Sequence, residues 1–449
     1  MTDASCDTFI DVKNSSVTEA NDGVRADPEN KEHRPAWPAD GQPGRWPYLP
    51  RMVGFVGVSA AMVAILVAAG APTPLLPIYE KQWGFAPWML TLAFGVYALA
   101  LLVAILVIGS LSDHVGRRPL MVGALAVELV AMLVFLFAPS IGWLIAARIV
   151  QGVATGAASS ALSAAVVELA PERHKKLGAL MTGMAPLAGL GIGALFAGVL
   201  AQFASDPTFV VWLVLVVVMA LGTVFTVFTP ETSTRKPGAL ASLIPRVSIP
   251  AQVRGLFVST LPVTISAFMM MALFLGLVPI VLTLVFGVRD PFIGALAAFV
   301  TFGAGTAVSA ITTAVGPHRL RLLGASAMVI GAILFIGSVS ATSLPLIWAA
   351  AVFAGGGLGA SFSGITRGLA PEVKPHERAG LFAGIYLVAY LAMGVSAIIA
   401  GQFAGPLGVT SMAVGFGIAI AIVALVGVVV TAGPAARRRN KARRAPSTP

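Results

Sequence analysis

Charged residues are scarce in this chain. Only 11% of its 449 residues are Asp, Glu, Lys or Arg, against about 25% in a typical soluble domain. A chain of this length could not cover a water-facing surface with so few charges. Hydrophobic residues, by contrast, make up 57% of the chain. The composition therefore excludes an ordinary soluble protein and indicates a protein that is solvated mostly by lipid.

Cysteine is almost absent, since Cys6 is the single one in the chain. One cysteine excludes an internal disulfide and a cysteine-based metal cluster. The five histidines lie in the polar N-terminal region or in predicted loops, without the spacing of metal ligands. We find no Walker phosphate loop and no catalytic constellation. The sequence therefore predicts no cofactor, no metal site and no enzymatic activity, and no obligate protein partner is evident.

Long hydrophobic runs recur from about residue 52 onward. A bilayer-spanning helix needs about 20 apolar residues. We predict twelve such helices over 52–79, 87–110, 119–138, 141–168, 176–203, 208–229, 255–287, 291–315, 320–340, 344–368, 377–403 and 406–432. Residues 1–51 are instead polar and broken by Pro, as is typical of a disordered tail. They lack the pattern of a cleaved signal peptide.

The distribution of Lys and Arg predicts the orientation of the chain. If the N-terminus is cytoplasmic, 26 of the 29 Lys and Arg residues fall in cytoplasmic segments. Lys81 and Arg289 fall outside, and Arg148 lies within a span. Because short cytoplasmic loops are enriched in positive charge, we predict a multi-pass protein of the cell (cytoplasmic) membrane with both termini inside. The basic tail, 433–449, is predicted to face anionic lipid rather than nucleic acid.

A short repeat indicates two related halves. The tetrapeptide LAPE occurs at 169–172 and again at 369–372, each time at the end of a Gly- and Ala-rich span. The pattern predicts two six-helix bundles of parallel topology, over 52–229 and 255–432. The polar segment 230–254 would join them on the cytoplasmic side.

A charged motif interrupts the hydrophobic runs between the second and third predicted spans. Residues 109–120 read GSLSDHVGRRPL. This resembles the signature of the major facilitator superfamily, G-x-L-[SA]-D-x-x-G-R-[RK]-x-[LV], and every defined position matches. The chain is most similar to the drug:proton antiporter (multidrug efflux) group. The resemblance implies an all-α membrane protein of twelve transmembrane helices in two pseudo-symmetric bundles of six.

This motif is predicted to act as a conformational latch between the two halves. Gly109 would let two helices approach closely, and Gly116 would permit a tight reversal of the chain. By resemblance, Asp113 would meet the positive N-terminal end of the eleventh span. Arg117 would reach the acidic Glu168 at the end of the fourth span. The predicted latch comprises Gly109, Asp113, Gly116, Arg117, Arg118 and Glu168. The alternative is a solvated turn with incidental charges.

Three polar residues fall within predicted spans. Arg148 and Gln151, in RIVQGVATG, match a family pattern of the fourth span. An intramembrane arginine is costly unless it is paired or wetted. The resemblance implicates Arg148 in substrate binding or proton transfer, and the alternative is a snorkelling structural arginine. Glu128 lies near the middle of the third span, where a carboxyl group favours its protonated form. It is either a proton carrier or a carboxyl group hydrogen-bonded to a neighbouring helix.

The resemblance also places a substrate cavity between the two halves. Aromatic and Met side chains suit a plastic, apolar site, although at helical spacing such side chains more often serve simple packing. The candidates are Tyr97, Phe268, Met270, Phe274, Tyr386 and Tyr390. In the first span, Pro72, Pro74 and Pro77 should distort the outer end of the helix.

These features together predict a secondary active transporter. Its expected activity is proton-driven export of small lipophilic compounds by alternating access, with protons and a small-molecule substrate as partners. One alternative is a proton-coupled uptake symporter for a metabolite, whose cavity should hold more polar anchors. Another is a membrane sensor that binds a ligand without transporting it.

Overall fold

The computed structural model describes residues 49–245, 247–374 and 377–444. In this part of the chain, twelve helical segments are long and apolar enough to cross a membrane, and no residue forms a strand. The predictions for the N-terminal tail and for the side chains of the basic C-terminal tail concern residues outside the described part.

The first six spans are α1 (Arg51–Gly70) with α2 (Pro72–Trp83), α3 (Trp88–Ile108), α5 (Arg117–Leu136), α6 (Ile141–Leu169), α7 (Lys175–Phe203) and α8 (Pro207–Val227). The other six are α10 (Arg254–Ala272) with α11 (Val278–Leu284), α12 (Pro291–Ile311), α13 (Pro317–Ala341), α14 (Leu344–Leu369), α15 (Arg378–Gln402) and α16 (Gly408–Arg444). Two short helices, α4 (Ser112–Val115) and α9 (Ala239–Ser242), lie in the loops. Each of the twelve predicted spans coincides with one of these segments, so the span prediction is confirmed.

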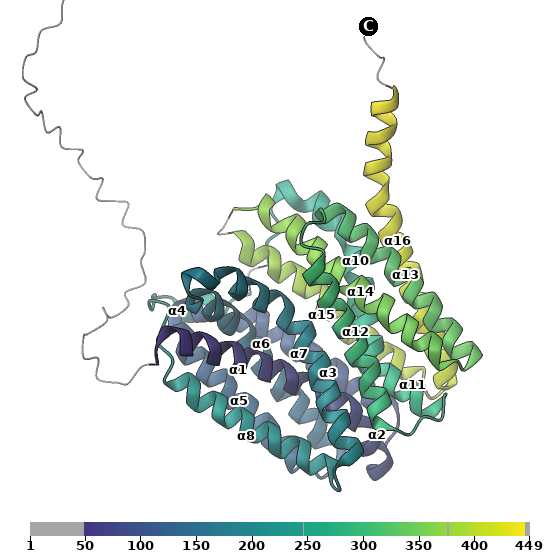
Figure 1. Cartoon of the computed structure of the whole chain (residues 1–449), viewed down its shortest axis with the longest axis horizontal. Helices are drawn as coiled ribbons and strands as arrows, with labels where there is room; N and C mark the ends of the chain where they lie inside the picture. Colours follow the sequence, from purple (N-terminus) through teal and green to yellow (C-terminus); the bar gives the residue numbers. More distant parts are fainter. Residues whose placement is uncertain (1–48, 246, 375–376, 445–449) are drawn as a thin grey trace, which may run out of the picture. The chain divides into compact units, whose positions relative to one another are not determined.

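The two sets of six helices repeat the same packing. In Figure 1, α5 lies beside α8 in the first set, and α13 lies beside α16 in the second. Gly152 lets α6 approach α3 so closely that a Cβ atom there would lie 2.5 Å from the carbonyl oxygen of Tyr97. Gly355 of α14 packs against the carbonyl oxygen of Thr301 of α12 in the same way. The predicted fold class, two pseudo-symmetric bundles of six helices, is therefore confirmed.

Proline interrupts the first and the seventh span. Pro72 has no N–H group, so the carbonyl oxygen of Ala68, four residues earlier, has no partner within the helix. The helix is interrupted there at Ala71, between α1 and α2, although the backbone of Ala71 stays in the right-handed helical region and α2 continues through Pro74 and Pro77. In the seventh span, Pro279 stands just after a π-helical turn, Leu273–Leu277, that joins α10 to α11. Such turns are frequent at functional sites.

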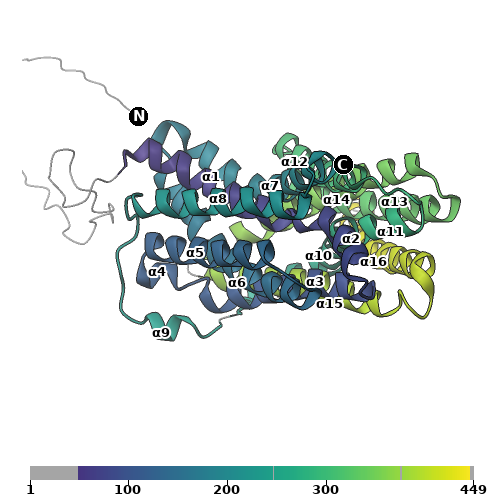
Figure 2. The same cartoon turned by 90° about the horizontal axis from the view of Figure 1, so that it is seen from below.

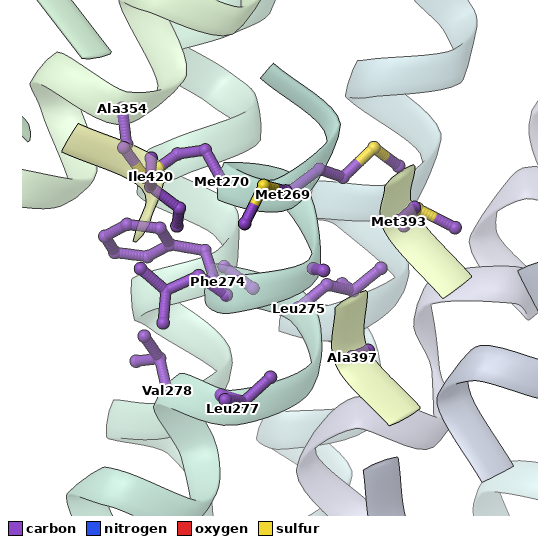
Figure 3. Close-up of a cluster of buried hydrophobic side chains, with 14 of the residues drawn as sticks. Met269, Met270, Phe274, Leu275, Leu277, Val278, Ala354, Met393, Ala397 and Ile420 are labelled. Carbon is purple, nitrogen blue, oxygen red and sulfur yellow. The ribbon is translucent and has the colours of Figure 1, made fainter. Parts of the chain in front are cut away.

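The seventh span lies at the centre of the described helices and is the most deeply buried of the twelve. Figure 3 shows its side chains pointing to two sides. Phe274 points toward Ala354 of α14, whereas Met269 and Leu275 point toward Met393 of α15. This span therefore contributes much of the core where the two halves meet.

The halves are in contact through α3 with α15 and through α7 with α12. A Cβ atom at Gly95 of α3 would lie 2.8 Å from the carbonyl oxygen of Gly394 of α15. Likewise, Gly198 of α7 packs directly on Ala295 of α12. Both contacts lie toward the end of the helices that carries Trp88, here named the Trp88 end, and away from the Asp113 end. The two halves therefore pack directly on each other toward the Trp88 end through these helices, and a cavity of about 530 Å³ lies between α2 and the α11–α12 region at the same end.

Candidate transport site

A buried polar cluster lies in the first half, where α5 packs on α6. Glu128, Arg148 and Gln151 are 0%, 3% and 0% exposed. Gln151 Nε2 donates a hydrogen bond to Glu128 Oε1 at 3.1 Å. Arg148 Nη1 donates to Gln151 Oε1 at 2.6 Å. The structure thus brings together the three intramembrane polar residues singled out from the sequence. The side-chain amide of Gln151 lies between the carboxyl group of Glu128 and the guanidinium of Arg148.

The break in the first span helps to position this cluster. Gln151 Nε2 also donates to the carbonyl oxygen of Ala68 at 3.0 Å, the oxygen that Pro72 leaves without a helical partner. Arg148 Nη1 donates to the neighbouring carbonyl of Ala69 at 3.4 Å. A change of charge in the cluster can therefore act on the junction between α1 and α2.

One oxygen of Glu128 remains without a partner. Its Oε2 atom is buried and accepts no hydrogen bond from any described residue. A buried polar atom without a partner is rare and calls for an explanation. A carboxyl group in this position can take up a proton on Oε2 without breaking its bond to Gln151.

The cluster borders a cavity through Tyr97. The guanidinium carbon of Arg148 lies 4.0 Å from the centroid of the Tyr97 ring, a distance typical of a cation–π contact. Tyr97 also helps to line a cavity of about 260 Å³. Four of the predicted cavity residues line it, namely Tyr97, Phe268, Tyr386 and Tyr390. The cavity extends along α6, α7 and α14 toward the Asp113 end, where it is lined by Ser163, Thr182 and Phe362.

The cavity prediction is wrong for Met270 and Phe274. Both are buried in the core between the seventh span and α14, at 1% and 0% exposure, and neither lines the cavity. The reason is the helical period, because residues three or four apart share a face. Phe268, Met271 and Leu275 form the face toward the cavity, and Met270 and Phe274 lie on another face.

The predicted latch residues meet, but within one half. Arg117 Nη2 lies 3.3 Å from Glu168 Oε1, which is the contact expected from the sequence. The Nη1 atom of the same guanidinium lies 2.5 Å from Asp113 Oδ1. Asp113 therefore pairs with Arg117 and not, as expected, with the start of α15.

The two latch glycines have different surroundings. Gly116 has φ 110°, a conformation that favours glycine, and it turns the chain from α4 into α5 as expected. At Gly109, a Cβ atom would meet only Ile105 of the same helix within 3.9 Å. The close approach of a second helix expected at Gly109 is therefore absent from the described structure.

Sequence reasoning missed Glu231, which follows α8. Its carboxylate accepts hydrogen bonds from the backbone N–H groups of Arg117 at 2.8 Å and Arg118 at 3.2 Å. A carboxylate at a helix N-terminus accepts hydrogen bonds from the free N–H groups. Its negative charge also interacts favourably with the positive end of the helix dipole. Next to it, Thr232 Oγ1 donates to Glu168 Oε2 at 2.5 Å. No local signal pointed to the contacts of Glu231, because Arg117 and Arg118 lie more than a hundred residues before it in the sequence.

The chain was also compared with known proteins. The family model of the Major Facilitator Superfamily matches residues 58–394. The chain therefore belongs to this superfamily, and the resemblance seen in the 109–120 motif is confirmed. It is a multi-pass membrane protein. Its family is a family of transporters, which are not enzymes.

Individual relatives are distant and differ in what they carry. The chain is 31% identical over 180 residues to the multi-drug resistance efflux pump PmrA homolog of Lactococcus lactis, covering 39% of this chain and 41% of that protein. It is 30% identical over 120 residues to the D-xylose transporter of Levilactobacillus brevis, covering 26% of each. The match thus spans less than half the length of these relatives.

A solved structure supports the fold alone. The crystal structure of the human organic anion transporter MFSD10 (TETRAN) has a TM-score of 0.60 to this chain at 17% sequence identity. The similarity covers 84% of this chain and 100% of that one.

Proposed function

We propose that this protein exports small lipophilic compounds from the cell in exchange for protons. The observation that carries the proposal is the contact of Arg148 with Tyr97, because it links the Glu128 cluster to the cavity. The similarity to an efflux pump homologue gives further support. In this proposal the Asp113 end faces the cytoplasm, and the present structure corresponds to the inward-facing state.

The proposed coupling follows from the charge balance of the cluster. When Glu128 is ionised, it balances the charge of Arg148 through the bridging amide of Gln151. Protonation at Oε2 removes that balance and leaves a buried cation without a counter-charge, which is costly. Arg148 then shifts relative to Tyr97 and to the carbonyl of Ala69. The proton thereby biases the packing of α1 and α3 around the cavity.

Alternating access would exchange closure between the two ends of the molecule. In the outward-facing state, the halves would separate at the Trp88 end and close at the Asp113 end. Asp113 would then come free to meet the start of α15, and the latch would hold that state. The present pairing of Asp113 with Arg117 is the released form of the latch in this proposal.

The test is an efflux assay with N-phenylnaphthylamine, an uncharged aromatic probe that fluoresces in lipid. Cells that make the protein should accumulate less probe than cells that lack it, and an uncoupler should raise accumulation. The variant Glu128→Gln keeps the size of the side chain but cannot ionise, so uncoupler-sensitive efflux should fall to the background. The control is Glu172→Gln, which alters an exposed acid paired with Lys175 in a loop.

The same assay separates the alternatives. An uptake symporter would raise accumulation, and the uncoupler would lower it. A sensor would change neither. Unaltered efflux by a Glu128→Gln protein that is present in the membrane in normal amounts would refute the role of Glu128.

A further inference from the structure

A groove of about 620 Å³ runs along α1 on the outside of the first half, between α7 and α8. Its floor belongs to α1 and includes Ala60 and Ala64, and its walls include Met181 of α7 and Val218 of α8. Apart from Ser59, every residue that lines it is apolar. We call it the α1 groove. Because all three helices span the membrane, it is open to lipid and not to water.

The α1 groove is separate from the transport cavity. On α1, Met62 and Ile65 line the cavity, whereas Val63 and Ala64 line the groove on another face of the helix. At the edge of the groove, the side chain of Val56 is 55% exposed. A molecule in the groove therefore lies against the membrane, with α1 between it and the cavity.

The corresponding helix of the second half is covered by protein. The most apolar part of the first span is 50% buried, whereas that of the seventh span is 94% buried. In the second half, Gly427 of α16 packs on Val263 of α10. In the first half, α8 meets α1 where Phe225 lies over Gly57. Between that contact and Val67, the groove leaves α1 open, so the shared packing scheme does not account for it.

The length of the groove matches that of one lipid tail. Its floor extends from Phe55 to Val67, which is about 18 Å of helix at about 1.5 Å per residue. The hydrocarbon core of a bilayer is about 30 Å thick, so the chains of one leaflet are about 15 Å long. Small residues such as Ala60 and Ala64 let a neighbour approach the helix closely. An acyl chain can therefore lie along the whole floor.

Positive charge lies at the Asp113 end of the groove. Arg51 stands one turn before Phe55 on α1, and Lys175 stands two residues before Leu177 on α7. Both basic residues are exposed. Each Lys or Arg near a membrane surface raises the affinity for anionic lipid about fivefold. A lipid whose tail lies in the groove would therefore place its headgroup at two cations.

The present partners of these cations leave room for a headgroup. Arg51 Nη2 donates to the carbonyl oxygen of Glu168 at 2.9 Å, which uses no negative charge. Lys175 Nζ lies 2.7 Å from Glu172 Oε2, but the two side chains are 60% and 74% exposed. Exposed ion pairs of this kind are weak. A phosphate can therefore share or replace Glu172 as the partner of Lys175.

We infer that the α1 groove binds one acyl chain of an anionic phospholipid, with the lipid phosphate beside Arg51 and Lys175. This inference goes beyond the proposed function and does not depend on it. The bound chain supports α1 directly before Ala68, the residue whose carbonyl oxygen accepts from Gln151. The lipid thereby stabilises the packing of α1 beside the polar cluster.

Photo-crosslinking tests the position of the chain. The full-length protein is placed in nanodiscs that contain phosphatidylglycerol with a diazirine in the middle of one acyl chain, and the labelled peptides are identified by mass spectrometry. We expect labelling to concentrate on residues 56–67 of α1 and 214–218 of α8. Labelling spread evenly over the lipid-facing spans would overturn the inference, as would a dimer in which a second copy of the chain covers the groove.

Filling the groove tests the same site by affinity. Ala60→Phe places a ring on the floor, and native mass spectrometry of the detergent-purified protein measures binding of the first phosphatidylglycerol. We expect the affinity to fall about tenfold, as for overpacking of a close-fitting site. Ala146→Phe is the control, because Ala146 is also exposed but lies on α6 outside the groove. Equal affinities of the two variants would contradict the site. If Ala60→Phe fails to fold, the crosslinking result decides.

A change of headgroup tests the role of charge. Phosphatidylglycerol should bind about fivefold more tightly than phosphatidylcholine with the same acyl chains, and Lys175→Gln should remove most of this difference. The control is Lys374→Gln, at an exposed lysine of the second half. Equal binding of the two lipids by the unaltered protein, or an equal effect of the two lysine variants, would refute the headgroup site.

Discussion

At the scale of single residues, Gln151 is the centre of the candidate site. Its amide donates to Glu128 and to the carbonyl of Ala68, and it accepts from Arg148. An amide is suited to this position because it donates and accepts at the same time. An acid or a hydroxyl group could satisfy only part of this set.

Replacing Gln151 by leucine should therefore destabilise the protein strongly. In Gln151→Leu, two acceptors lose their donor and the buried guanidinium of Arg148 loses its short bond. We expect the free energy of unfolding to fall by about 2–4 kcal/mol, measured as a lower thermal midpoint of the detergent-purified protein. Gln402→Leu is the control, since Gln402 is exposed at the end of α15. Equal midpoints for the two variants would contradict this role.

At the scale of elements, the segment between α8 and α10 contacts residues of the predicted latch. Figure 2 shows it passing the end of the helices at which α4 lies, with α9 on its path. Ser110 Oγ donates to the carbonyl of Ser242 at 2.7 Å, which ties the segment to the first half. Gln252 Nε2 donates to Glu377 Oε2 at 3.2 Å, beside the start of α15. The segment is therefore bonded to both halves at the Asp113 end.

Glu231 should decide how firmly the first part of this segment is held. Glu231→Ala removes the acceptor for two backbone N–H groups at the start of α5. The free energy that holds the segment closed should fall by about 1 kcal/mol. This corresponds to about a fivefold rise in the rate of trypsin cleavage at Arg235 and Lys236, which are exposed. Glu372→Ala, at an exposed acid of the second LAPE repeat, should leave the rate unchanged. Equal rates for both variants would mean that Glu231 does not hold the segment.

At the scale of the whole molecule, the two halves share a packing scheme but not a chemistry. Glu128 bonds to Gln151 in the first half. In the second half, Gly331 packs against Ala354, and each lies 203 residues after its counterpart. The polar cluster thus has no equivalent at these positions of the second half. In the proposed cycle, the first half senses the proton and the second half supplies the apolar surface.

The orientation of the molecule can be tested by labelling. With Cys6 replaced by Ser, Arg235→Cys and Arg289→Cys each carry a single exposed thiol, on segments at opposite ends of the spans. A membrane-impermeant maleimide should label the Arg289 variant in right-side-out vesicles. It should label the Arg235 variant in inside-out vesicles alone. The reverse pattern would place the Asp113 end outside and overturn the inward-facing assignment.

Much of the fold was predictable because lipid imposes a simple rule on the chain. A span needs a long apolar run with its backbone bonds satisfied internally, so hydrophobicity alone located all twelve helices. The 109–120 motif indicated the family because its residues lie close together in sequence. The cost of Arg148 and Glu128 in lipid marked the polar cluster in the same way.

The tertiary structure alone decided which side chains meet. The sequence could not separate Phe268 from Met270, because the direction of each depends on the rotation of α10 in its surroundings. Nor could it show that Glu231 holds the start of α5, or that Asp113 pairs inside its own half. The sequence by itself determined which segments enter the lipid, since solvation depends on composition. Contacts between distant residues depend on how the helices pack and on which end of the molecule is closed.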